Sequence, residues 1–490
     1  MPIVNKVQLI TYADSLGGDL RSLGAMLRTG LRGLFPGGVH ILPPFPSSAD
    51  RGFAPTTYFE IEKRFGTWED LRAISEICPI LVDVMVNHIS RRSEYFEDFA
   101  KRGRRSPNAD LFITIDKVWP DGIVPPGDIA KIFLRKPDNP FSDIRIEETG
   151  EIERVWTSFG KKDWSEQIDL DARSPATRRL LRGILEHLAG NGVSAVRLDA
   201  VGYVTKKAGT SCFFVEPEIY EFMDWIKGEA DALGLALLPE VHAHFSYQRK
   251  LAGRGYWVYD FVLPGLILHA LTSGSGEKLA AYLRDCPRKQ VTTLDCHDGI
   301  PIQPDLDDVL DVGEARALVD ACVDRGANIN RIISAHSKAQ DFDAHQINIT
   351  YYEALGRDDD AYIASRAIQF FSPGVPQVYY VGLLAGLNDF EGVEAVGDGR
   401  AINRRNYTSE ETMRELERPV VRRLMELIRF RNSHPAFEGQ FWAECDGSHS
   451  LVLSWKAGAD DFCVLRVDLA DGKASIEHSG PGGARIRFVP

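Results

Sequence analysis

Carboxylates, an arginine and histidines follow four apolar, strand-like segments of the chain. These segments end in the runs Asp83-Val-Met-Val-Asn-His88, Arg197-Leu-Asp199, Glu240-Val-His242 and Asp295-Cys-His-Asp298. Polar side chains at the ends of buried strands are unfavourable unless a function retains them, so we expect the four ends to meet at one site. Glycosidic chemistry needs two carboxylates, one to attack the anomeric carbon and one to protonate the leaving oxygen, about 5–5.5 Å apart in a retaining enzyme.

Each carboxylate has a predicted role in such chemistry. Asp199 alternates with Arg197 on one strand face, and we expect the guanidinium to keep Asp199 ionised as the nucleophile. Glu240 follows Leu237-Leu-Pro239, an apolar setting that raises a carboxyl pKa and suits a general acid. Asp298 is expected to bind sugar hydroxyls and to favour an oxocarbenium-like transition state.

The same residues also have a structural interpretation. An isolated Arg-x-Asp pair on a strand is more often an ion pair, histidines at strand ends often cap or pack, and Asp83 can simply hold a loop. The ordered set over four strands favours catalysis over these alternatives.

Short β-rich runs alternate with helix-like stretches, which is typical of parallel βα units. The helix-like stretches include Thr177–Ala189, Pro217–Ala232 and Ala361–Phe371. Eight such units predict an α/β fold, a (β/α)8 TIM barrel, with its active site at the carboxyl ends of the strands. The expected strands are Val7–Tyr12, His40–Pro43, Ile80–Val86, Ala195–Leu198, Leu235–Val241, Trp257–Leu263, Val291–Leu294 and Val375–Val381.

Two connections are too long for simple βα loops and predict insertions. The barrel is expected in residues 1–88, 170–298 and 353–434, with an insertion domain B at 89–169 and a second insertion domain, B′, at 299–352. Short alternating runs then predict a C-terminal antiparallel β domain at 435–490. These runs are Ser450–Trp455, Asp461–Asp468 and Ala484–Val489.

Composition narrows the class of protein. The 490 residues carry a formal net charge of −13, which argues against general binding to nucleic acid or to an anionic membrane. The chain begins without the pattern of a signal peptide and has no apolar run long enough to cross a bilayer. Its seven cysteines are scattered without a CxxC pair, so we expect reduced thiols in a cytoplasmic protein.

The four strand-end runs resemble the conserved regions of the α-amylase superfamily, glycoside hydrolase family 13, and the resemblance covers nearly the whole chain. It implies Asp199 as nucleophile, Glu240 as acid/base and Asp298 as transition-state stabiliser. Runs such as Ala208-Gly-Thr-Ser-Cys-Phe213 and Pro373-Gly-Val-Pro-Gln-Val-Tyr-Tyr-Val-Gly382 resemble the sucrose phosphorylase branch. The residues that this resemblance implies for substrate binding are Asp50, Phe53, His88, Phe159, Gln167, Arg197, Tyr203, His242, His297 and Arg404.

The sucrose phosphorylase branch also implies a reaction. A glucosyl group moves onto Asp199, and inorganic phosphate then removes it as α-glucose 1-phosphate. The implied partners are a small sugar, phosphate and glucose 1-phosphate. The resemblance implies no metal or organic cofactor, and it leaves open whether the protein forms a homodimer.

Two segments depart from the sucrose phosphorylase pattern. Where that branch carries a tyrosine before Gln-Val-Asn, this chain has His345 before Gln346, and where it reads Pro-Arg, this chain reads Leu134-Arg-Lys-Pro137. The added cationic or hydrogen-bonding groups resemble the sucrose 6F-phosphate phosphorylases, whose leaving group is fructose 6-phosphate. We therefore expect Arg135, Lys136, His345 and Gln346 to bind the acceptor or phosphate.

Other interpretations stay open. Arg135 and Lys136 are also compatible with solvated surface charges, and His345 with a neutral replacement. The branch further contains plain sucrose phosphorylases and phosphorylases of glucosylglycerol or glucosylglycerate. A hydrolytic amylase fits these runs less well. A non-catalytic amylase-like barrel, as in transporter heavy chains, would lose the carboxylates that this chain keeps.

Overall fold

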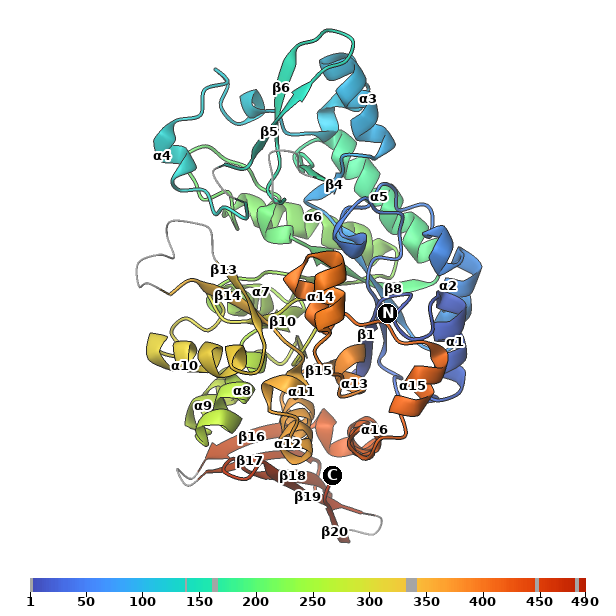
Figure 1. Ribbon diagram of the computed structural model, residues 1–490, viewed down its shortest axis with the longest axis vertical. Helices are drawn as coiled ribbons and strands as arrows, with labels where there is room; N and C mark the ends of the chain where they lie inside the picture. Colours follow the sequence, from blue (N-terminus) through green and yellow to red (C-terminus); the bar gives the residue numbers. More distant parts are fainter. Residues whose placement is uncertain (1–2, 137–138, 161–165, 332–341, 446–448, 481–483) are drawn as a thin grey trace. The chain divides into compact units, whose positions relative to one another are not determined.

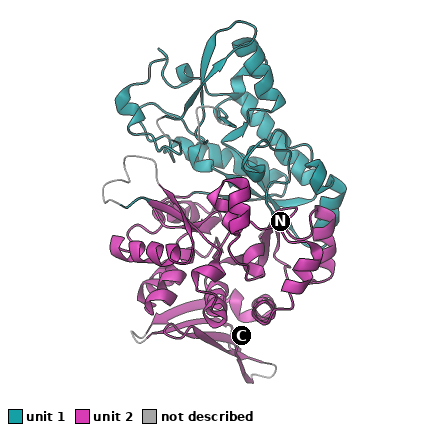
Figure 2. Ribbon diagram, viewed as in Figure 1, with its two compact units in different colours: residues 1–2, 41–241, 332–343 teal, residues 3–40, 242–331, 344–490 magenta. Residues whose placement is uncertain are grey.

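The structure is a computed structural model, which describes residues 3–136, 139–160, 166–331, 342–445, 449–480 and 484–490. Two compact units divide the chain. One contains Ile41–Val241, and the other contains Ile3–His40, His242–Arg331 and Ala344–Pro490 (Figure 2). The borders expected for the barrel, the insertions and the C-terminal domain stay predictions. The ten residues 332–341 of the expected second insertion lie outside the described part of the chain.

Eight strands form one parallel sheet in the order β10-β11-β15-β1-β2-β3-β8-β9. Figure 1 labels β1, β8, β10 and β15 of this sheet. Each overlaps one of the eight expected segments, so the predicted (β/α)8 class is confirmed. The strands are β1 Gln8–Thr11, β2 Gly38–Ile41, β3 Ile80–Met85, β8 Val193–Asp199, β9 Ala236–Pro239, β10 Val258–Asp260, β11 Gln290–Thr292 and β15 Val375–Tyr379. Strand β3 is buried throughout, as expected for parallel strands that are covered on both faces.

Local signals explain the helices of the unit that contains β3, β8 and β9. Helix α5 (Pro175–Gly190) begins after Ser174, whose hydroxyl accepts a hydrogen bond from the N–H of Ala176, and it has proline at its first position. A stripe of leucines on α5 is buried. Helix α6 (Glu218–Ala232) follows β8 and begins directly after Pro217. Helix α5 contains the predicted stretch Thr177–Ala189, and α6 contains all of Pro217–Ala232 except Pro217.

In the other unit, strand β10 ends earlier than the expected Trp257–Leu263. Helix α8 (Leu263–Ser273) begins within that segment. The Asp260 carboxylate accepts hydrogen bonds from the N–H groups of Val262 and Leu263, which turns the chain from strand into helix.

Asp260 also makes the stability of the fold depend on pH. Burial outweighs the hydrogen bonds that this carboxylate accepts from a tyrosine, a glutamine and two backbone N–H groups, and it raises the pKa of Asp260 to about 6. The folded state then binds a proton more strongly than the unfolded state between the ordinary value of 3.8 and 6. Asp260 therefore adds stability as the pH falls through this window, by up to about 3 kcal/mol.

We expect the unfolding temperature of the wild type, measured relative to that of Asp260→Asn, to rise as the pH falls from 7 to 4. The asparagine cannot take up this proton, so other groups cancel in the comparison. The exposed variant Asp460→Asn serves as a control and should follow the wild type. A wild-type advantage over Asp260→Asn that stays constant with pH would contradict this account.

The long segment after β3 has a hydrophobic core of its own. Strand β4 (His88–Ser90) pairs with β7 (Gln167–Asp169), and β5 (Phe141–Arg145) forms an antiparallel hairpin with β6 (Ile152–Trp156). Helix α3 (Glu94–Arg102) covers part of this core. The buried core residues are Ile89, Phe96, Phe99, Leu111, Phe112, Ile144, Ile146, Val155, Ile168 and Leu170. This packing fixes β4 and β7, which carry two of the expected binding residues.

The chain closes in a five-stranded antiparallel sheet, ordered β16-β17-β18-β19-β20, which confirms the predicted C-terminal β domain. Its strands are β16 Gln440–Cys445, β17 Ser450–Ala457, β18 Asp461–Asp468, β19 Lys473–Ser479 and β20 Arg485–Phe488. The sequence did not indicate β16 or β19. Strand β19 is largely polar, and the exposed Trp442 obscures the alternation of β16. Trp455 donates a hydrogen bond to the Phe371 carbonyl of helix α12 (Asp359–Phe371) at 2.7 Å, which anchors the sheet.

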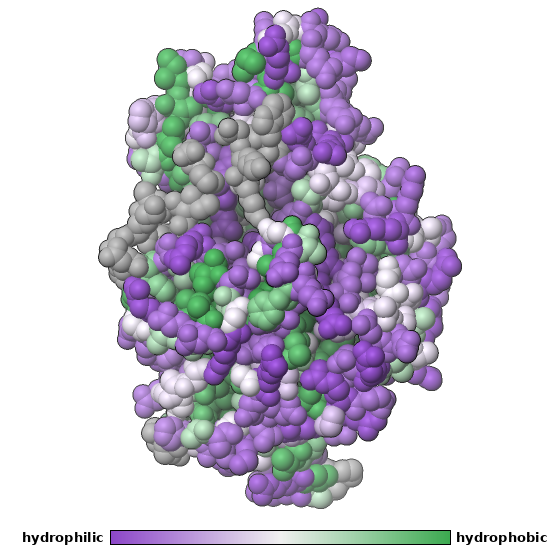
Figure 3. All heavy atoms as spheres, in the orientation of Figure 1, coloured by the Kyte–Doolittle hydropathy of each residue, from purple (hydrophilic) through white to green (hydrophobic). Residues whose placement is uncertain are grey.

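No helix in the described part of the chain is both long and apolar enough to cross a membrane. The face drawn in Figure 3 is largely hydrophilic, and apolar side chains are scattered among the polar ones. Such scattering is ordinary for a protein surface.

Candidate active site

Strands β3, β8 and β9 bring three carboxylates to one guanidinium. Parallel pairing places Asp83 beside Arg197 and Met85 beside Asp199. Arg197 Nη1 donates to Asp83 and, at 2.9 Å, to Asp199 Oδ1, while Nη2 lies 3.1 Å from Glu240 Oε1. The expected contact between Arg197 and Asp199 is therefore present, and Glu240 joins it.

The shared arginine bears on the protonation expected for Asp199. Burial raises the pKa of Asp199 well above its ordinary value, and the carboxylates of Glu240 and Asp83 raise it further, against the single positive charge of Arg197. One guanidinium is thus divided among three carboxylates, which weakens its hold on the charge of Asp199, and the prediction that Arg197 keeps Asp199 ionised stays a prediction.

A left-handed residue after β8 holds Glu240. Ala200 has φ 54° and ψ 28°, a conformation that alanine disfavours, and its N–H donates to Glu240 Oε2 at 2.9 Å. Because Arg197 contacts the other oxygen, both oxygens of Glu240 have a donor, and the carboxyl group is fixed in orientation.

Side chains expected to bind the glucosyl unit surround Phe53. The Phe53 carbonyl oxygen accepts a hydrogen bond from Gln167 Nε2 at 2.9 Å and lies 3.0 Å from His88 Nε2. The ring centroid of Phe159 lies 5.2 Å from that of His88 and 5.0 Å from that of Tyr203. The structure thus brings these five predicted residues together.

A strained turn joins this cluster to the carboxylates. Asp50 and Arg51 have φ values of 50° and 48°, and Gly52 follows with φ 114°, so three successive residues are left-handed. Such strain persists where the surrounding structure enforces it, often at functional sites. The turn delivers the Phe53 ring to 5.9 Å from the Arg197 guanidinium.

In the other unit, Asp298 is surrounded by basic groups. Its Oδ1 lies 3.2 Å from Arg400 Nη1, and its Oδ2 lies 3.6 Å from His297 Nε2 and 3.9 Å from His242 Nε2. Burial alone would raise the pKa of Asp298, but these three side chains and Arg404 outweigh burial and hold the pKa well below its ordinary value. Asp298 is therefore ionised, as expected for a carboxylate that binds sugar hydroxyls.

Backbone contacts hold this group in place. Arg404 Nε donates to the His297 carbonyl at 2.7 Å, and Asn403 Nδ2 donates to the Asp298 carbonyl at 3.0 Å. Three residues that the sequence assigns to substrate binding, His242, His297 and Arg404, thus lie around Asp298.

Two further residues of this group were not expected. Arg400 contacts Asp298 directly, although of this segment only Arg404 was expected to bind substrate. Asp305 is fully buried, and its Oδ1 lies 3.8 Å from His242 Nδ1, so the imidazole stands between two carboxylates. No sequence pattern signals Asp305, because an aspartate after a proline resembles any loop residue.

His345 and Gln346 lie in β14 (Ala344–Asn348), which is buried throughout. His345 Nδ1 lies 2.6 Å from the Gln303 carbonyl oxygen, which can only accept, so Nδ1 carries a proton. His345 Nε2 is then an acceptor in the neutral ring and a donor only in the imidazolium. Its ring centroid lies 6.3 Å from that of His242. The buried Gln346 Oε1 has no hydrogen-bond partner within the described residues.

The two basic residues of the first insertion have different environments. Arg135 is half-buried, whereas Lys136 is only 3% exposed. Lys136 Nζ donates to Thr157 Oγ1 at 2.6 Å, to the Phe141 carbonyl at 3.0 Å and to Ser142 Oγ at 3.5 Å. All three N–H groups are used inside the insertion, so the prediction that Lys136 binds the acceptor is wrong.

A buried ammonium group supports the strand that carries His88. Lys206 Nζ lies 2.7 Å from Asp169 Oδ2 and donates to Asn87 Oδ1 at 2.8 Å and to the Tyr203 carbonyl. Burial opposes ionisation of Asp169, but Lys206 and the hydrogen bonds from Ser158 lower its pKa. The ion pair thus joins Asn87, next to His88, to the end of β7.

We expect Lys206→Met to lower the free energy of unfolding by about 3–5 kcal/mol, because it leaves the Asp169 carboxylate buried without its cation. The adjacent variant Lys207→Met is a matched control. Lys207 is half-exposed and pairs with Glu218 at the surface, so its loss should cost less than about 1 kcal/mol. Denaturant unfolding measures both. Equal losses of unfolding free energy in the two variants would contradict this account. Addition of Asp169→Asn to Lys206→Met should restore part of the lost unfolding free energy.

Cys296, His297 and Asp298 offer three potential ligand atoms within 4.8 Å of one another. The positive charge of Arg400 beside Asp298 disfavours a metal ion at this place. The expectation of no metal or cofactor stays a prediction.

The parallel sheet and the buried carboxylates define an α-amylase-type barrel enzyme, and residues 14–245 match the family described as alpha amylase, catalytic domain. The chain is 55% identical to a sucrose 6F-phosphate phosphorylase of Thermoanaerobacterium thermosaccharolyticum over 490 residues, 100% of each chain. It is 44% identical to a glucosylglycerol phosphorylase of Marinobacter adhaerens, over 96% of this chain and 95% of that protein. A crystal structure of sucrose 6F-phosphate phosphorylase from Thermoanaerobacter thermosaccharolyticum matches with a TM-score of 0.96 and 54% identity, over 100% of this chain and 98% of that one.

The chain therefore belongs to the glycoside phosphorylases of the α-amylase superfamily, in the group that contains sucrose 6F-phosphate phosphorylase. The predicted family is confirmed. Since members of this group act on different acceptors, the acceptor depends on the particular residues at the acceptor site.

Proposed function

We propose that this chain transfers a glucosyl unit from sucrose 6F-phosphate to inorganic phosphate, giving α-D-glucose 1-phosphate and fructose 6-phosphate with retention of configuration. The observation that carries the proposal is the 55% identity to a sucrose 6F-phosphate phosphorylase over the full length of both chains. That length includes the segments that hold Arg135 and His345, where the chain departs from plain sucrose phosphorylases.

In the first half-reaction, Asp199 attacks the anomeric carbon while Glu240 protonates the oxygen that leaves with fructose 6-phosphate. The proton that Glu240 donates leaves with the fructosyl oxygen. Arg197, which contacts both carboxylates, orients them for this transfer. The products of the step are a β-glucosyl ester of Asp199 and a Glu240 carboxylate.

In the second half-reaction, phosphate attacks the same carbon and breaks the ester. The Glu240 carboxylate can take the proton of the attacking phosphate, which returns the site to its starting state. The low pKa of Asp298 keeps this carboxylate ionised for the oxocarbenium-like transition state of both steps. Two displacements restore the α configuration.

We assign the phosphate of the fructosyl part to His345 and Arg135. Because His345 Nδ1 is bound to the Gln303 carbonyl, a phosphate at Nε2 requires the imidazolium, which then supplies both a hydrogen bond and a charge. Arg135 adds a guanidinium suited to phosphate oxygens. Gln346 supplies a further polar group from the same strand as His345.

We expect His345→Ala and Arg135→Ala each to lower kcat/KM for sucrose 6F-phosphate by about 10–100-fold, the loss of one hydrogen bond to a charged group. The value for sucrose should change less than about threefold. Lys131→Ala, an exposed lysine of the same insertion, is the matched control and should leave both values unchanged. Equal losses on the two substrates would show that these residues do not bind this phosphate.

The class of reaction is tested by its products. With sucrose 6F-phosphate and phosphate, glucose 1-phosphate should accumulate with little free glucose, whereas release of glucose alone would indicate a hydrolase. An acceptor screen from glucose 1-phosphate, with fructose 6-phosphate, fructose, glycerol and glycerate, separates the proposed activity from those of the related phosphorylases.

We place the reaction in the cytosol, because no disulfide links the seven cysteines, all of which lie in described parts of the chain.

A further inference from the structure

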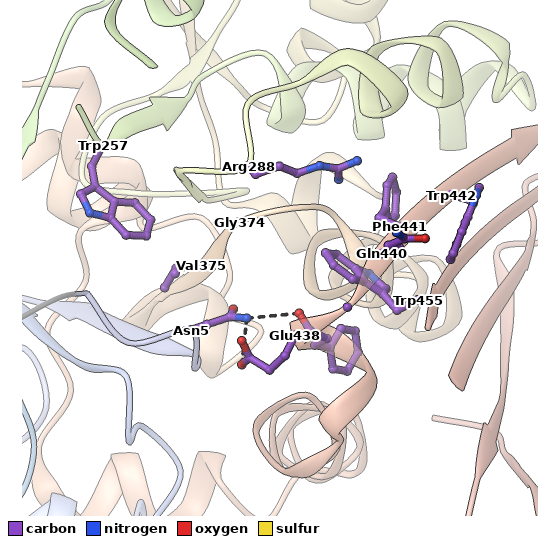
Figure 4. Close-up of a pocket in the computed structure, with 12 residues that line it drawn as sticks. Asn5, Trp257, Arg288, Gly374, Val375, Glu438, Gln440, Phe441, Trp442 and Trp455 are labelled. Carbon is purple, nitrogen blue, oxygen red and sulfur yellow. Dashed lines mark hydrogen bonds between the residues drawn. The ribbon is translucent and has the colours of Figure 1, made fainter. Parts of the chain in front are cut away.

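A cavity of about 530 Å³ lies in the unit that contains β10, β11 and β15. Arg288, which lines the cavity, precedes strand β11, whereas Asp298 follows the other end of that strand. The segments that lead into β1, β10 and β11 form one side, and the first strands of the C-terminal sheet form the other (Figure 4). A molecule bound there is therefore not the reacting substrate.

Aromatic rings dominate the lining. Trp257, Trp442 and Trp455 are three of the eight tryptophans in the chain, and Phe437 and Phe441 lie among them. Several indole side chains in one cavity provide large apolar faces, and these rigid side chains lose little conformational entropy when a ligand binds. A ligand of this cavity should therefore present a flat apolar face.

Trp442 presents an exposed indole at the edge of the cavity. Its neighbours in the alternation of β16, Phe441 and Ala443, are buried in the sheet, whereas the Trp442 side chain is 43% exposed beside the cavity. An indole in this position gains from covering by an apolar surface.

Polar groups complete the lining in a fixed arrangement. The Arg288 guanidinium lies over the Phe441 ring, 5.0 Å from its centroid, which orients its hydrogen-bond donors. Across the cavity, Asn5 Nδ2 donates to Glu438 Oε1 at 3.1 Å and to the Phe437 carbonyl at 3.2 Å, which positions an acceptor carboxylate (Figure 4). The cavity thus offers oriented donors and an oriented acceptor.

The charges of the lining identify the class of ligand. Among the described residues of the lining, Arg288 and Glu438 are the only charged side chains, and their charges cancel, so the cavity does not select a phosphate or another anion. A purely apolar ligand would leave both charges without a partner. A pyranose satisfies the whole set, because one face of its ring carries C–H groups and its rim carries neighbouring hydroxyls that both donate and accept.

We propose that this cavity is a second saccharide-binding site, which takes a neutral pyranoside against Trp442 with its hydroxyls on Arg288 and Glu438. The site is independent of the proposed reaction, because it lies at the opposite end of the strands and uses none of the catalytic residues. Its size suits one or two sugar rings.

The test is a titration of the full chain with maltose, a neutral disaccharide, followed by tryptophan fluorescence and by saturation-transfer NMR. Trp442→Ala and Arg288→Ala should weaken binding at least tenfold, while Trp442→Phe, which keeps an aromatic face, should retain most of it. Phosphorolysis of sucrose 6F-phosphate should be unchanged in all three variants. Phe390→Ala, which removes an exposed aromatic ring outside the cavity, is the matched control and should bind as the wild type does.

Three outcomes would overturn the proposal. The first is that neither maltose nor methyl α-glucoside binds at concentrations of about 100 mM. The second is that binding survives in Trp442→Ala and Arg288→Ala. In the third, a purine nucleotide would bind in a Trp442-dependent manner where neither saccharide does, which would assign the indole and guanidinium to a base instead.

Discussion

Replacement of Asp199 by asparagine is expected to lower phosphorolysis of sucrose 6F-phosphate by at least about 10⁴-fold. The amide cannot form the glucosyl ester, so both half-reactions are lost, including exchange between glucose 1-phosphate and labelled phosphate. The unfolding temperature, in contrast, should not fall. The variant removes one of three carboxylates that compete for Arg197, and burial already opposes the charge of Asp199.

An unfolding temperature equal to or above that of the wild type, together with the lost activity, is the combined result that identifies a catalytic residue. Asp83→Asn is the control variant for both measurements, activity and unfolding temperature. Asp83 contacts the same arginine from a fully buried position but has no part in bond formation. Retention of more than about one per cent of the activity in Asp199→Asn would contradict the assignment.

Glu240→Gln is expected to show a loss that depends on the leaving group. A general acid contributes about 10²–10⁴-fold, and a fructosyl oxygen cannot leave readily without a proton. Turnover of sucrose 6F-phosphate should therefore fall by about 10³-fold. Fluoride needs no proton to leave, so formation of the glucosyl-enzyme from α-glucosyl fluoride should fall by much less.

The measurement is a pair of single-turnover rates, one for each donor, in Glu240→Gln and in the wild type. His242→Gln, a neighbour in sequence that binds Asp298, is the control and should slow both donors alike. If Glu240→Gln slowed the fluoride as strongly as the sugar phosphate, Glu240 would not be the acid.

The strand ends were predictable because a parallel barrel imposes their arrangement. Once eight βα units are recognised, Arg197, Asp199 and Glu240 must follow adjacent strands, and the register of β3 with β8 then places Asp83 beside Arg197. Of the carboxylate contacts, only that between Arg197 and Asp199 follows from spacing on one strand; those of Asp83 and Glu240 with Arg197 come from the structure. The raised pKa of Asp199 was not predictable, because it depends on how many carboxylates share one guanidinium, and the sequence does not show that number.

Loops were less predictable, for reasons that differ from residue to residue. Arg135 and Lys136 are adjacent basic residues with the same apparent role, but only Lys136 enters the core of the insertion, and the sequence does not distinguish the two. Arg400 lies about a hundred residues after Asp298, and Asp305 lies about sixty residues after His242, so no local pattern records either contact. The buried position of Lys206 likewise depends on Asp169, a residue of β7 in the preceding insertion.

The substrate assignment is tested most directly by kcat/KM for phosphorolysis of sucrose 6F-phosphate and of sucrose by the wild-type enzyme, with glucose 1-phosphate as the measured product. Two charged contacts to the additional phosphate, from His345 and Arg135, predict a preference for sucrose 6F-phosphate of at least about 10²-fold. Equal values, or a preference for sucrose, would contradict the assignment of fructose 6-phosphate as the leaving group.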